Sequence, residues 1–269
     1  SSREERGRRG GLALRGMSLI FRVEEVAEID STNDACRQRA LQGEQAGLVI
    51  RADLQTKGRG RRGRDWSSPK GNLYTSLLLR PARPAGEIAT LGFVAVLALG
   101  DAVQAILPPT IRVAHKWPND LLLNGRKVSG ILLETQAVPG AAPFVILGMG
   151  VNILSHPADT PYPVTDLLAN GAALIQPREL LDRLLAAFAP AYAAWEQGGF
   201  AAIEPAWRRR AVGIGQPIEV RLQSGSLHGT FRDLDSDGAL RLALPEGGER
   251  RISAGDVYFP SQAPGPSGG

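Results

Sequence analysis

Residues 111–153 hold three apolar runs that follow one another with only short turns between them. The runs are IRVAHKW, DLLLNGRKVSGILLET and PFVILGMGVNI, and Asn124-Gly125 interrupts the second one. This dipeptide favours the two-residue turn of a β-hairpin, because both positions accept a positive φ. Strands joined by such turns have to pair in one sheet. Similar apolar runs predict further strands at residues 21–26, 47–54 and 72–79.

Two longer segments place apolar residues at the spacing of an α-helix. Residues 86–107 carry Ile88, Leu91, Val94, Ala95, Ala98, Leu99 and Val103, and the later segment carries Leu181, Leu184, Leu185, Phe188, Tyr192 and Trp195. A shorter helix is predicted after Asp30 or Ser31, either of which suits an N-cap, and it ends near Gly43. Helices and neighbouring strands together predict an α+β fold.

The chain changes character after residue 211. Four short runs, PIEVRL, LHGTFRDLD, ALRLAL and RRISAG, alternate with turns that contain Gly and Asp. This pattern predicts a small β-barrel of SH3 size. We therefore expect a disordered basic tail (residues 1–16), a catalytic domain (17–211), a barrel (212–260) and a flexible tail (261–269).

Composition excludes several classes of protein. No apolar run approaches the roughly 20 residues of a membrane span, and no secretory segment is recognisable. The single cysteine, Cys36, excludes an internal disulfide framework, so we expect a cytoplasmic protein without a membrane partner. The histidines, His115, His156 and His228, are isolated and lack the spacing of metal ligands.

The net charge of +4 is concentrated in two places. Residues 1–16 contribute +3 and residues 57–65 contribute +4, which leaves −3 for the rest of the chain. A general nucleic-acid-binding protein normally spreads basic residues over a folded face. The folded body here is mildly acidic, and we expect no DNA partner.

The second basic segment, TKGRGRRGRDW (residues 56–66), has five cationic side chains among three glycines, and we call it the Arg/Gly loop. Its GRGRRG part matches the dinucleotide pattern G-x-G-x-x-G, but RDWSSPKGN and a strand follow where that motif requires a helix. No P-loop sequence is present. Arginine pairs well with phosphate, and exposed cations this close repel one another, so the loop is predicted to bind a polyanion.

Five motifs occur in an order that resembles the biotin protein ligase family. They are STN (residues 31–33), GRGRRGRDW (58–66), KWPND (116–120), RKVSGILLE (126–134) and GMGVNI (148–153). The pair GRGRRG and KWPND is highly specific to that family, and the resemblance extends over residues 20–260. Some members carry an N-terminal helix-turn-helix domain. The 30 residues before STN are too few for one, which indicates the monofunctional form without DNA binding.

The resemblance implies an α+β fold with a mixed-sheet catalytic domain of the biotin/lipoate protein ligase type and an SH3-like C-terminal barrel. It also implies a two-step reaction. Biotin attacks the α-phosphate of ATP, with Mg²⁺, to give biotinyl-5′-AMP. The biotin then passes to one lysine of a biotin carboxyl carrier protein or domain, such as that of acetyl-CoA carboxylase. A homodimer is compatible with this assignment.

The resemblance also implies a set of biotin-binding residues. Biotin's ureido ring has one acceptor and two donors, which a dry pocket has to match. For Ser31 and Asn33, capping of the following helix is an alternative role. The implied set is Ser31, Thr32, Asn33, Gln55, Gly58, Arg59, Gly60, Arg61, Lys127 and Gly130.

A second implied set binds ATP and the adenylate: Arg59, Arg61, Arg64, Trp66, Lys116, Asn119, Lys127 and Asn152. Lys127, Arg61 and Asp120 are the implied catalytic residues. Lys127 is expected to bridge the biotin carboxylate and the α-phosphate, and Asp120 is the candidate Mg²⁺ ligand. The alternatives are a surface lysine, a turn-capping role for Asp120 or Asn119, and a Trp66 that only packs.

The Arg/Gly loop is expected to act as a lid over the reactive adenylate, with arginines that close on the phosphate. In an empty site its cations should repel one another and leave it mobile. Two alternative functions stay open. One is a ligase for another carboxylate cofactor, such as lipoate. The other, from a different class, is a basic nucleic-acid-binding module.

Overall fold

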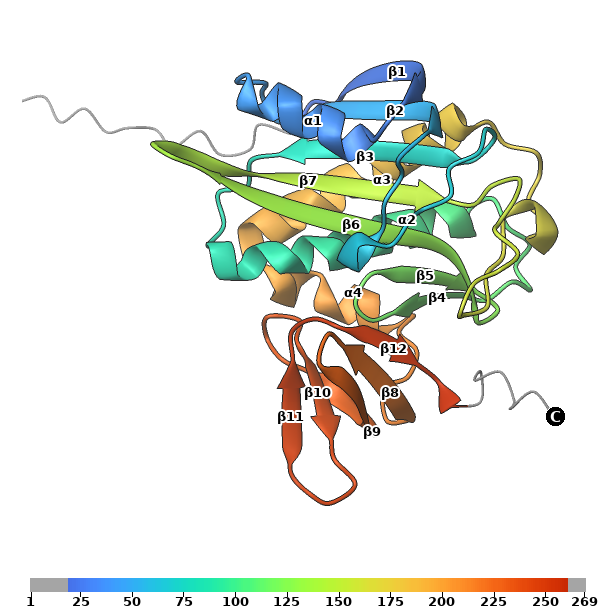
Figure 1. Cartoon of the computed structure of the whole chain (residues 1–269), viewed down its shortest axis with the longest axis vertical. Helices are drawn as coiled ribbons and strands as arrows, with labels where there is room; N and C mark the ends of the chain where they lie inside the picture. Colours follow the sequence, from blue (N-terminus) through green and yellow to red (C-terminus); the bar gives the residue numbers. More distant parts are fainter. Residues whose placement is uncertain (1–18, 261–269) are drawn as a thin grey trace, which may run out of the picture.

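A computed structural model describes residues 19–260, which form a large domain with a seven-stranded sheet and a small domain with a five-stranded sheet (Figure 1). The large sheet has the order β1-β2-β3-β7-β6-β5-β4. Strands β1 and β2 are parallel and the other neighbours are antiparallel, so the predicted mixed sheet is confirmed. The strands are β1 (Arg22–Ile29), β2 (Leu48–Gln55), β3 (Leu73–Leu79), β4 (Val113–Lys116), β5 (Asp120–Leu123), β6 (Arg126–Val138) and β7 (Ala141–Val151).

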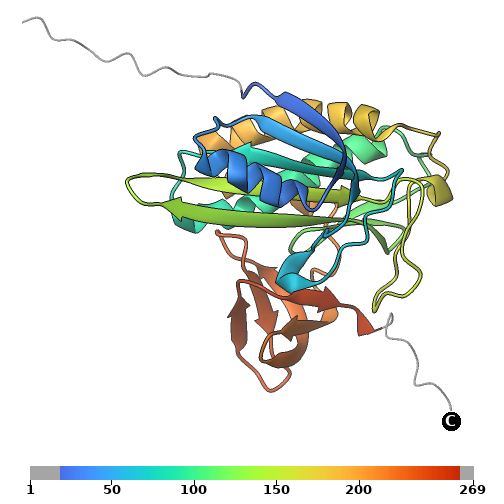
Figure 2. The same cartoon turned by 45° about the horizontal axis from the view of Figure 1, so that its top comes forward.

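Helices cover both faces of this sheet (Figures 1 and 2). Helices α2 (Leu91–Gln104) and α3 (Pro177–Gly198) pack on one face and build the main core, while α1 (Thr32–Leu41) packs on the other. Alternate residues of β3 show this division: Leu77 and Leu79 belong to the main core, and Leu78 packs with Cys36 of α1. The period-two pattern of a strand produces both apolar faces.

Helix α2 is the most apolar helix of the chain that the structure describes. Together with the 3₁₀ turn before it, it forms a stretch, Ala85–Gln104, that is long and apolar enough to cross a membrane by length and composition. Its apolar window is 72% buried within the fold, so it serves as the core helix. The predicted helix at 86–107 is therefore present, but its first turn is 3₁₀ and its α-helical part is shorter.

The hairpin predicted at Asn124-Gly125 is confirmed. Asn124 and Gly125 have φ values of 46° and 80°, as a turn between β5 and β6 requires. A second hairpin follows at once, because Gly140, with a φ of 71°, joins β6 to β7. These two turns place the RKVSGILLE segment at the centre of the sheet.

The small domain is a five-stranded antiparallel sheet of order β11-β10-β9-β8-β12, as expected for an SH3-like barrel. Its strands are β8 (Pro217–Leu222), β9 (Gly225–Leu234), β10 (Leu240–Ala243), β11 (Glu249–Ile252) and β12 (Asp256–Tyr258). Strand β12 was not predicted, since its three residues are too short for a pattern.

Short helix α4 (Glu204–Arg208) leads from the large domain into the barrel. Trp117 Nε1 donates a hydrogen bond of 2.9 Å to the carbonyl oxygen of Gly238, and Phe93 packs beside the same glycine. Apolar residues of the barrel belong to the same core cluster as α2 and α3, so the barrel is packed firmly on the catalytic domain. The tails predicted at residues 1–16 and 261–269 lie outside the described residues.

Candidate active site

One pocket lies where the start of α1, the ends of β2, β6 and β7, the Arg/Gly loop and the barrel meet. We call the side that contains Thr32, Asn33 and Gln55 the polar floor. The opposite side contains Arg61, Arg64, Asp120 and Lys127, and we call it the charged side. Sheet residues and the loop after β7 complete the pocket. The lining consists of Ser31, Thr32, Asn33, Gln55, Arg59, Gly60, Arg61, Arg64, Asp65, Trp66, Thr75, Asp120, Lys127, Gly130, Ile131, Leu132, Gly148, Met149, Gly150, Tyr162 and Asp256.

Most of the predicted site residues come together in this lining. They are Ser31, Thr32, Asn33, Gln55, Arg59, Gly60, Arg61, Arg64, Trp66, Asp120, Lys127 and Gly130. They come from five separate segments of the sequence, and only the folding of the sheet brings them together. Their roles toward a ligand stay predictions.

Four predicted residues lie outside this lining. Gly58 is buried and packs against Ser68 and the backbone of Trp66. Asn119 lies against α2 and lines a separate cleft beside Trp117. Lys116 and Asn152 are the other two: Lys116 forms an ion pair with Asp120, and Asn152 lines an adjoining pocket with Trp66, Lys127 and Tyr162.

The polar floor is a connected set of hydrogen bonds. The Gln55 side-chain carbonyl accepts bonds from the backbone N–H of Thr32 (2.9 Å) and from its hydroxyl (3.1 Å). Ser76 Oγ lies 2.5 Å from Asn33 Oδ1 and 2.7 Å from Thr32 Oγ1. Thr32, Asn33 and Ser76 are buried, so these groups hold a fixed donor and acceptor pattern toward the pocket.

Ser31 has the capping role that was its alternative. Its hydroxyl accepts a hydrogen bond of 3.3 Å from the backbone N–H of Asp34, and Ser31 is the N-cap of α1. Ser31 also lines the pocket, so a cap and a ligand contact are compatible.

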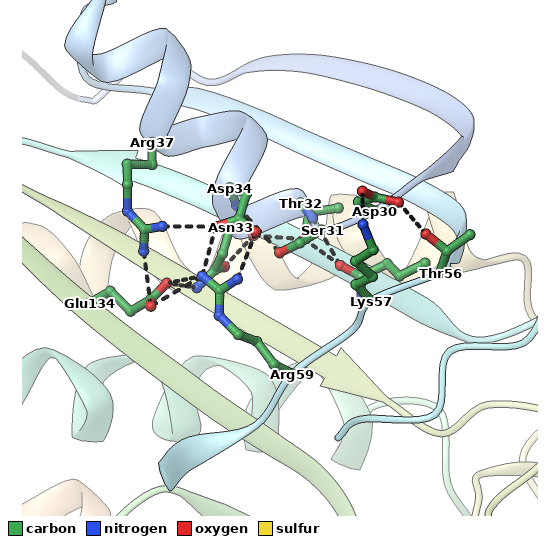
Figure 3. A network of polar contacts seen from close by, with 12 residues as sticks. Asp30, Ser31, Thr32, Asn33, Asp34, Arg37, Thr56, Lys57, Arg59 and Glu134 are labelled. Carbon is green, nitrogen blue, oxygen red and sulfur yellow. Dashed lines mark hydrogen bonds and ion pairs between the residues drawn. The ribbon is translucent and has the colours of Figure 1, made fainter. Parts of the chain in front are cut away.

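A four-charge network closes the side of the pocket beside α1 (Figure 3). Arg59 of the Arg/Gly loop lies 2.6 Å from Asp34 and 3.1 Å from Glu134. Arg37 reaches the same two carboxylates, at 2.7 and 2.9 Å. The hydrogen bond from Arg59 lowers the pKa of Asp34. Glu134 also accepts a bond of 2.7 Å from Asn33, so the network joins the loop to the polar floor.

The other cations of the Arg/Gly loop have acidic partners as well. Lys57 lies 2.8 Å from Asp30, and the three remaining arginines surround Asp256 of the barrel. The expectation of mutually repelling, unpaired cations is therefore wrong. The partners are distant in the sequence, just before and within α1, in β6 and in β12, so the loop's own composition does not reveal them. This pairing also weakens the nucleic-acid alternative.

Lys127 and Asp120 lie at the centre of the charged side. Lys127 Nζ is 2.9 Å from one carboxylate oxygen of Asp120, and Lys116 Nζ is 3.0 Å from the other. Burial raises the pKa of Asp120, but the charges of Lys127 and Lys116 outweigh it and hold this pKa below its ordinary value. Lys127 Nζ also lies 4.9 Å above the ring of Tyr162. This lysine is not a freely moving surface lysine.

Trp66 combines packing with an unused donor. Its ring lies over Gly130 and Gly150: a Cβ on Gly150 would collide with the ring, and one on Gly130 would come within 3.2 Å of it. Its Nε1 is buried and has no hydrogen-bond partner among the described residues. A buried donor without a partner is costly, which points to an acceptor on a bound ligand or a water.

Sequence reasoning missed three residues of the lining that belong to no motif: Thr75 of β3, and Tyr162 and Asp256. Tyr162 lies in the irregular segment between β7 and α3, and Asp256 starts the short strand β12. Neither is part of a motif used to assign the site. Burial raises the pKa of Tyr162, which keeps its hydroxyl protonated and able to donate.

The described residues hold no preformed cluster of metal ligands. Within residues 19–260, no group of three His, Cys, Asp or Glu side chains is placed to hold a metal ion. Both oxygens of Asp120 contact lysine ammonium groups, which compete with a cation. The histidines are scattered: His115 is buried, His156 pairs with Asp166, and His228 is exposed.

The pocket combines a polar floor, a partly buried lysine and several arginines, which suits a site for two adjacent anionic groups, as in an acyl-activating ligase. Residues 26–152 match the Biotin/lipoate A/B protein ligase family, and residues 213–259 match the Biotin protein ligase C terminal domain.

Similar proteins cover almost the whole chain. A biotin–[acetyl-CoA-carboxylase] ligase of Paracoccus denitrificans is 42% identical, over 87% of this chain and 99% of that protein. The enzyme of the same name from Mycobacterium tuberculosis is 34% identical, over 87% and 88%. The solved biotin protein ligase of Aquifex aeolicus, in complex with biotin and ATP, superposes with a TM-score of 0.74 at 27% identity, over 88% and 97%. The chain belongs to the biotin protein ligase family.

Proposed function

We propose that this biotin protein ligase binds biotin on the polar floor and ATP beneath the Arg/Gly loop, with the two reacting groups meeting at Lys127. In the first step a biotin carboxylate oxygen bonds to the α-phosphorus of ATP, and pyrophosphate leaves. In the second step a lysine amine of the acceptor attacks the acyl carbon of biotinyl-5′-AMP. AMP leaves, and the amine loses a proton.

The polar floor suits the ureido ring of biotin. Thr32, Asn33 and Gln55 present hydroxyl and amide groups, and Ile131, Leu132 and Met149 supply apolar surface beside them. A ring with one acceptor and two donors gains affinity only where each polar group is matched. Lipoate lacks such a ring, so this floor favours biotin.

Lys127 carries the main part of the proposal. Its ammonium group lies in the same pocket as the polar floor and the arginines Arg61 and Arg64. A carboxylate and a phosphate repel each other as they approach, and charge grows on the phosphate oxygens during the transfer. A fixed ammonium group offsets both effects, and Asp120 and Lys116 keep it fixed.

Arg61, Arg64 and Trp66 are assigned to the nucleotide. Arg61 and Arg64 lie on the charged side of the pocket, and Trp66 lines the same pocket and has a buried Nε1 without a partner among the described residues. Asn152 borders the adjoining pocket and is assigned to the same ligand. Mg²⁺ is assigned to the phosphates of ATP, since Asp120, the candidate ligand, is already paired with two lysines.

The acceptor is assigned as the biotin carboxyl carrier domain of a biotin-dependent carboxylase, because the similar proteins are named for acetyl-CoA carboxylase. A cytoplasmic location fits a carboxylase partner. The homodimer stays a prediction, which sedimentation of the full chain with and without biotin and ATP would test.

The experiment is biotin-dependent exchange of labelled pyrophosphate into ATP, followed by transfer to a purified carrier domain. We expect exchange with biotin and none with lipoate or without an acid. Label should then appear on one carrier lysine. Exchange that is equally fast with lipoate, or without any acid, would contradict the proposal.

A further inference from the structure

The carboxylate of Asp256 contacts three arginines of the Arg/Gly loop. Its oxygens lie 2.9 Å from Arg64, 3.2 Å from Arg62 and 3.5 Å from Arg61. The Asp256 side chain is only 14% exposed, so this contact is partly shielded from solvent. Of the barrel residues that the structure describes, only Asp256 lines the pocket.

Backbone groups of the barrel support the same contact. Arg61 donates a hydrogen bond of 2.9 Å to the carbonyl oxygen of Gly255, and Arg62 donates one of 3.2 Å to that of Arg221. Asp256 is held in place because β12 pairs with β8, where it faces Arg221. In Figure 2 the short helical turn of the loop lies directly above strand β12.

The part of the loop that meets the barrel is a tight turn over residues 60–64. Arg62 has a φ of 61°, a left-handed conformation that a non-glycine residue adopts at a cost. Gly63 follows it with a φ of 71°, and two backbone hydrogen bonds close the turn locally: Gly60 N–H donates to the Arg64 carbonyl (2.7 Å), and Arg64 N–H donates to the Arg61 carbonyl (3.4 Å). The contacts to the barrel add to these local bonds and fix where the turn lies.

The loop therefore has two anchors on two different domains. Its first part, residues 57–59, which we call the root, pairs with Asp30, Asp34 and Glu134 of the catalytic domain. Its second part, residues 61–64, which we call the tip, pairs with Asp256. The root adjoins the polar floor, and the tip covers the charged side of the pocket.

We propose that Asp256 is a positioning residue through which the C-terminal barrel holds the tip closed and so retains the adenylate. The proposal rests on the function proposed above. One carboxylate neutralises part of the mutual repulsion of three guanidinium groups and fixes Arg61 and Arg64 before the nucleotide arrives. Asp256 is assigned to the arginines and not to the reacting atoms. The barrel thereby controls nucleotide retention, while the catalytic domain controls biotin binding.

The first test is limited proteolysis of the full-length, unliganded enzyme. Trypsin cuts after Lys57 and Arg59 in the root and after Arg61, Arg62 and Arg64 in the tip, and mass spectrometry of the first products separates these bonds. For Asp256→Asn we expect tip cleavage about tenfold faster, from the loss of one charged contact, with root cleavage unchanged. Asp256→Glu should restore much of the protection.

The second test measures the reaction. For Asp256→Asn we expect the KM for ATP to rise about tenfold and more adenylate to escape into the filtrate. The dissociation constant of biotin should change less than about twofold, because the root is intact. Arg62→Gln removes one of the three guanidinium groups without touching the pocket lining, and it should act in the same direction with a smaller effect.

The matched control is Asp235→Asn, since Asp235 is a barrel carboxylate that also pairs with two arginines, Arg241 and Arg251, away from the pocket. It should leave both readouts unchanged. Tip cleavage of Asp256→Asn at the wild-type rate would overturn the proposal. So would an equal change in root cleavage and biotin affinity, which would show general loss of structure. The cleavage test does not require turnover. If the wild-type enzyme showed no biotin-dependent exchange, the proposed function would be refuted, but cleavage would still test whether Asp256 holds the tip.

Discussion

Lys127 Nζ and Asp120 Oδ1 lie 2.9 Å apart across the β5–β6 hairpin, with the second oxygen of Asp120 bound to Lys116. The hairpin turn at Asn124-Gly125 brings KWPND and RKVSGILLE side by side, so the two motifs form one site. Asp120 offsets one of the two lysine charges, so the three groups keep one net positive charge. The two ion pairs also hold both ammonium groups in place. That arrangement predicts a defect in turnover when Lys127 is removed.

We expect Lys127→Ala to lower the rate of adenylate formation by about 10²–10³-fold, because one fixed charge that stabilises the transition state is lost. Biotin affinity should fall much less, since the polar floor is intact. Stopped-flow measurement of adenylate formation checks this, with the exposed Lys70→Ala as the matched control. A rate within about threefold of wild type would place Lys127 outside the chemistry.

Gly148→Ala tests the biotin assignment of the floor. A Cβ at this position would collide with the carboxamide of Asn33, which is held by Ser76 and Glu134. The displaced amide should weaken biotin binding by about tenfold or more, by loss of a hydrogen bond in a buried site. Isothermal titration with biotin measures this.

The control for that experiment is Gly86→Ala, because a Cβ on Gly86 meets no atom within 4 Å and its φ is not positive. Its affinity for biotin should equal that of the wild type. If Gly148→Ala bound biotin equally well, Asn33 would not be part of the biotin site.

Arg61→Gly should release the adenylate. The substitution removes a guanidinium group from the pocket lining and its bond to the Gly255 carbonyl, and it adds a flexible glycine. A charged hydrogen bond of roughly 1.5–3 kcal/mol corresponds to an escape rate about ten- to a hundredfold higher. The measurement is biotin on a bystander protein such as serum albumin. Adenylate made at the normal rate, with label confined to the carrier lysine, would place retention elsewhere in the loop.

His115 gives the fold a defined pH dependence. The ring is buried, Nδ1 lies 3.0 Å from the carbonyl oxygen of Trp207, and Nε2 has no partner among the described residues. Burial lowers the pKa of His115 from 6.5 to about 4. The folded state therefore favours the neutral ring, and the stability this contributes is present above pH 6.5 and lost as the pH falls toward 4.

The expected loss in that window is about 3 kcal/mol in the free energy of unfolding. Urea unfolding at a series of pH values measures it. His115→Asn retains a donor toward Trp207 and should flatten the slope between pH 6.5 and 4, although packing loss lowers its stability at pH 7. The exposed His228→Asn is the control, and an unchanged slope in His115→Asn would show that another group titrates.

The local sequence was sufficient for most of the strands and helices. The hairpin at Asn124-Gly125, the helical spacing of residues 86–107 and the change of pattern at the barrel each depend on neighbouring residues, and each was observed. The STN, GRGRRG, KWPND and RKVSGILLE motifs also located most of the pocket lining, because the residues that contact a ligand lie in short contiguous segments.

Only the tertiary structure determines which acidic residues pair with the arginines of the Arg/Gly loop. The partners of Arg59 and Arg61 lie 75 and 195 residues further along, at Glu134 and Asp256. Charge repulsion within the loop is a property of the local sequence, but its neutralisation depends on β6 and β12 folding against it. Ion pairs have no sequence period: the packing of the loop against β6 brings Arg59 to Glu134, and the packing of the barrel on the catalytic domain brings Asp256 to Arg61.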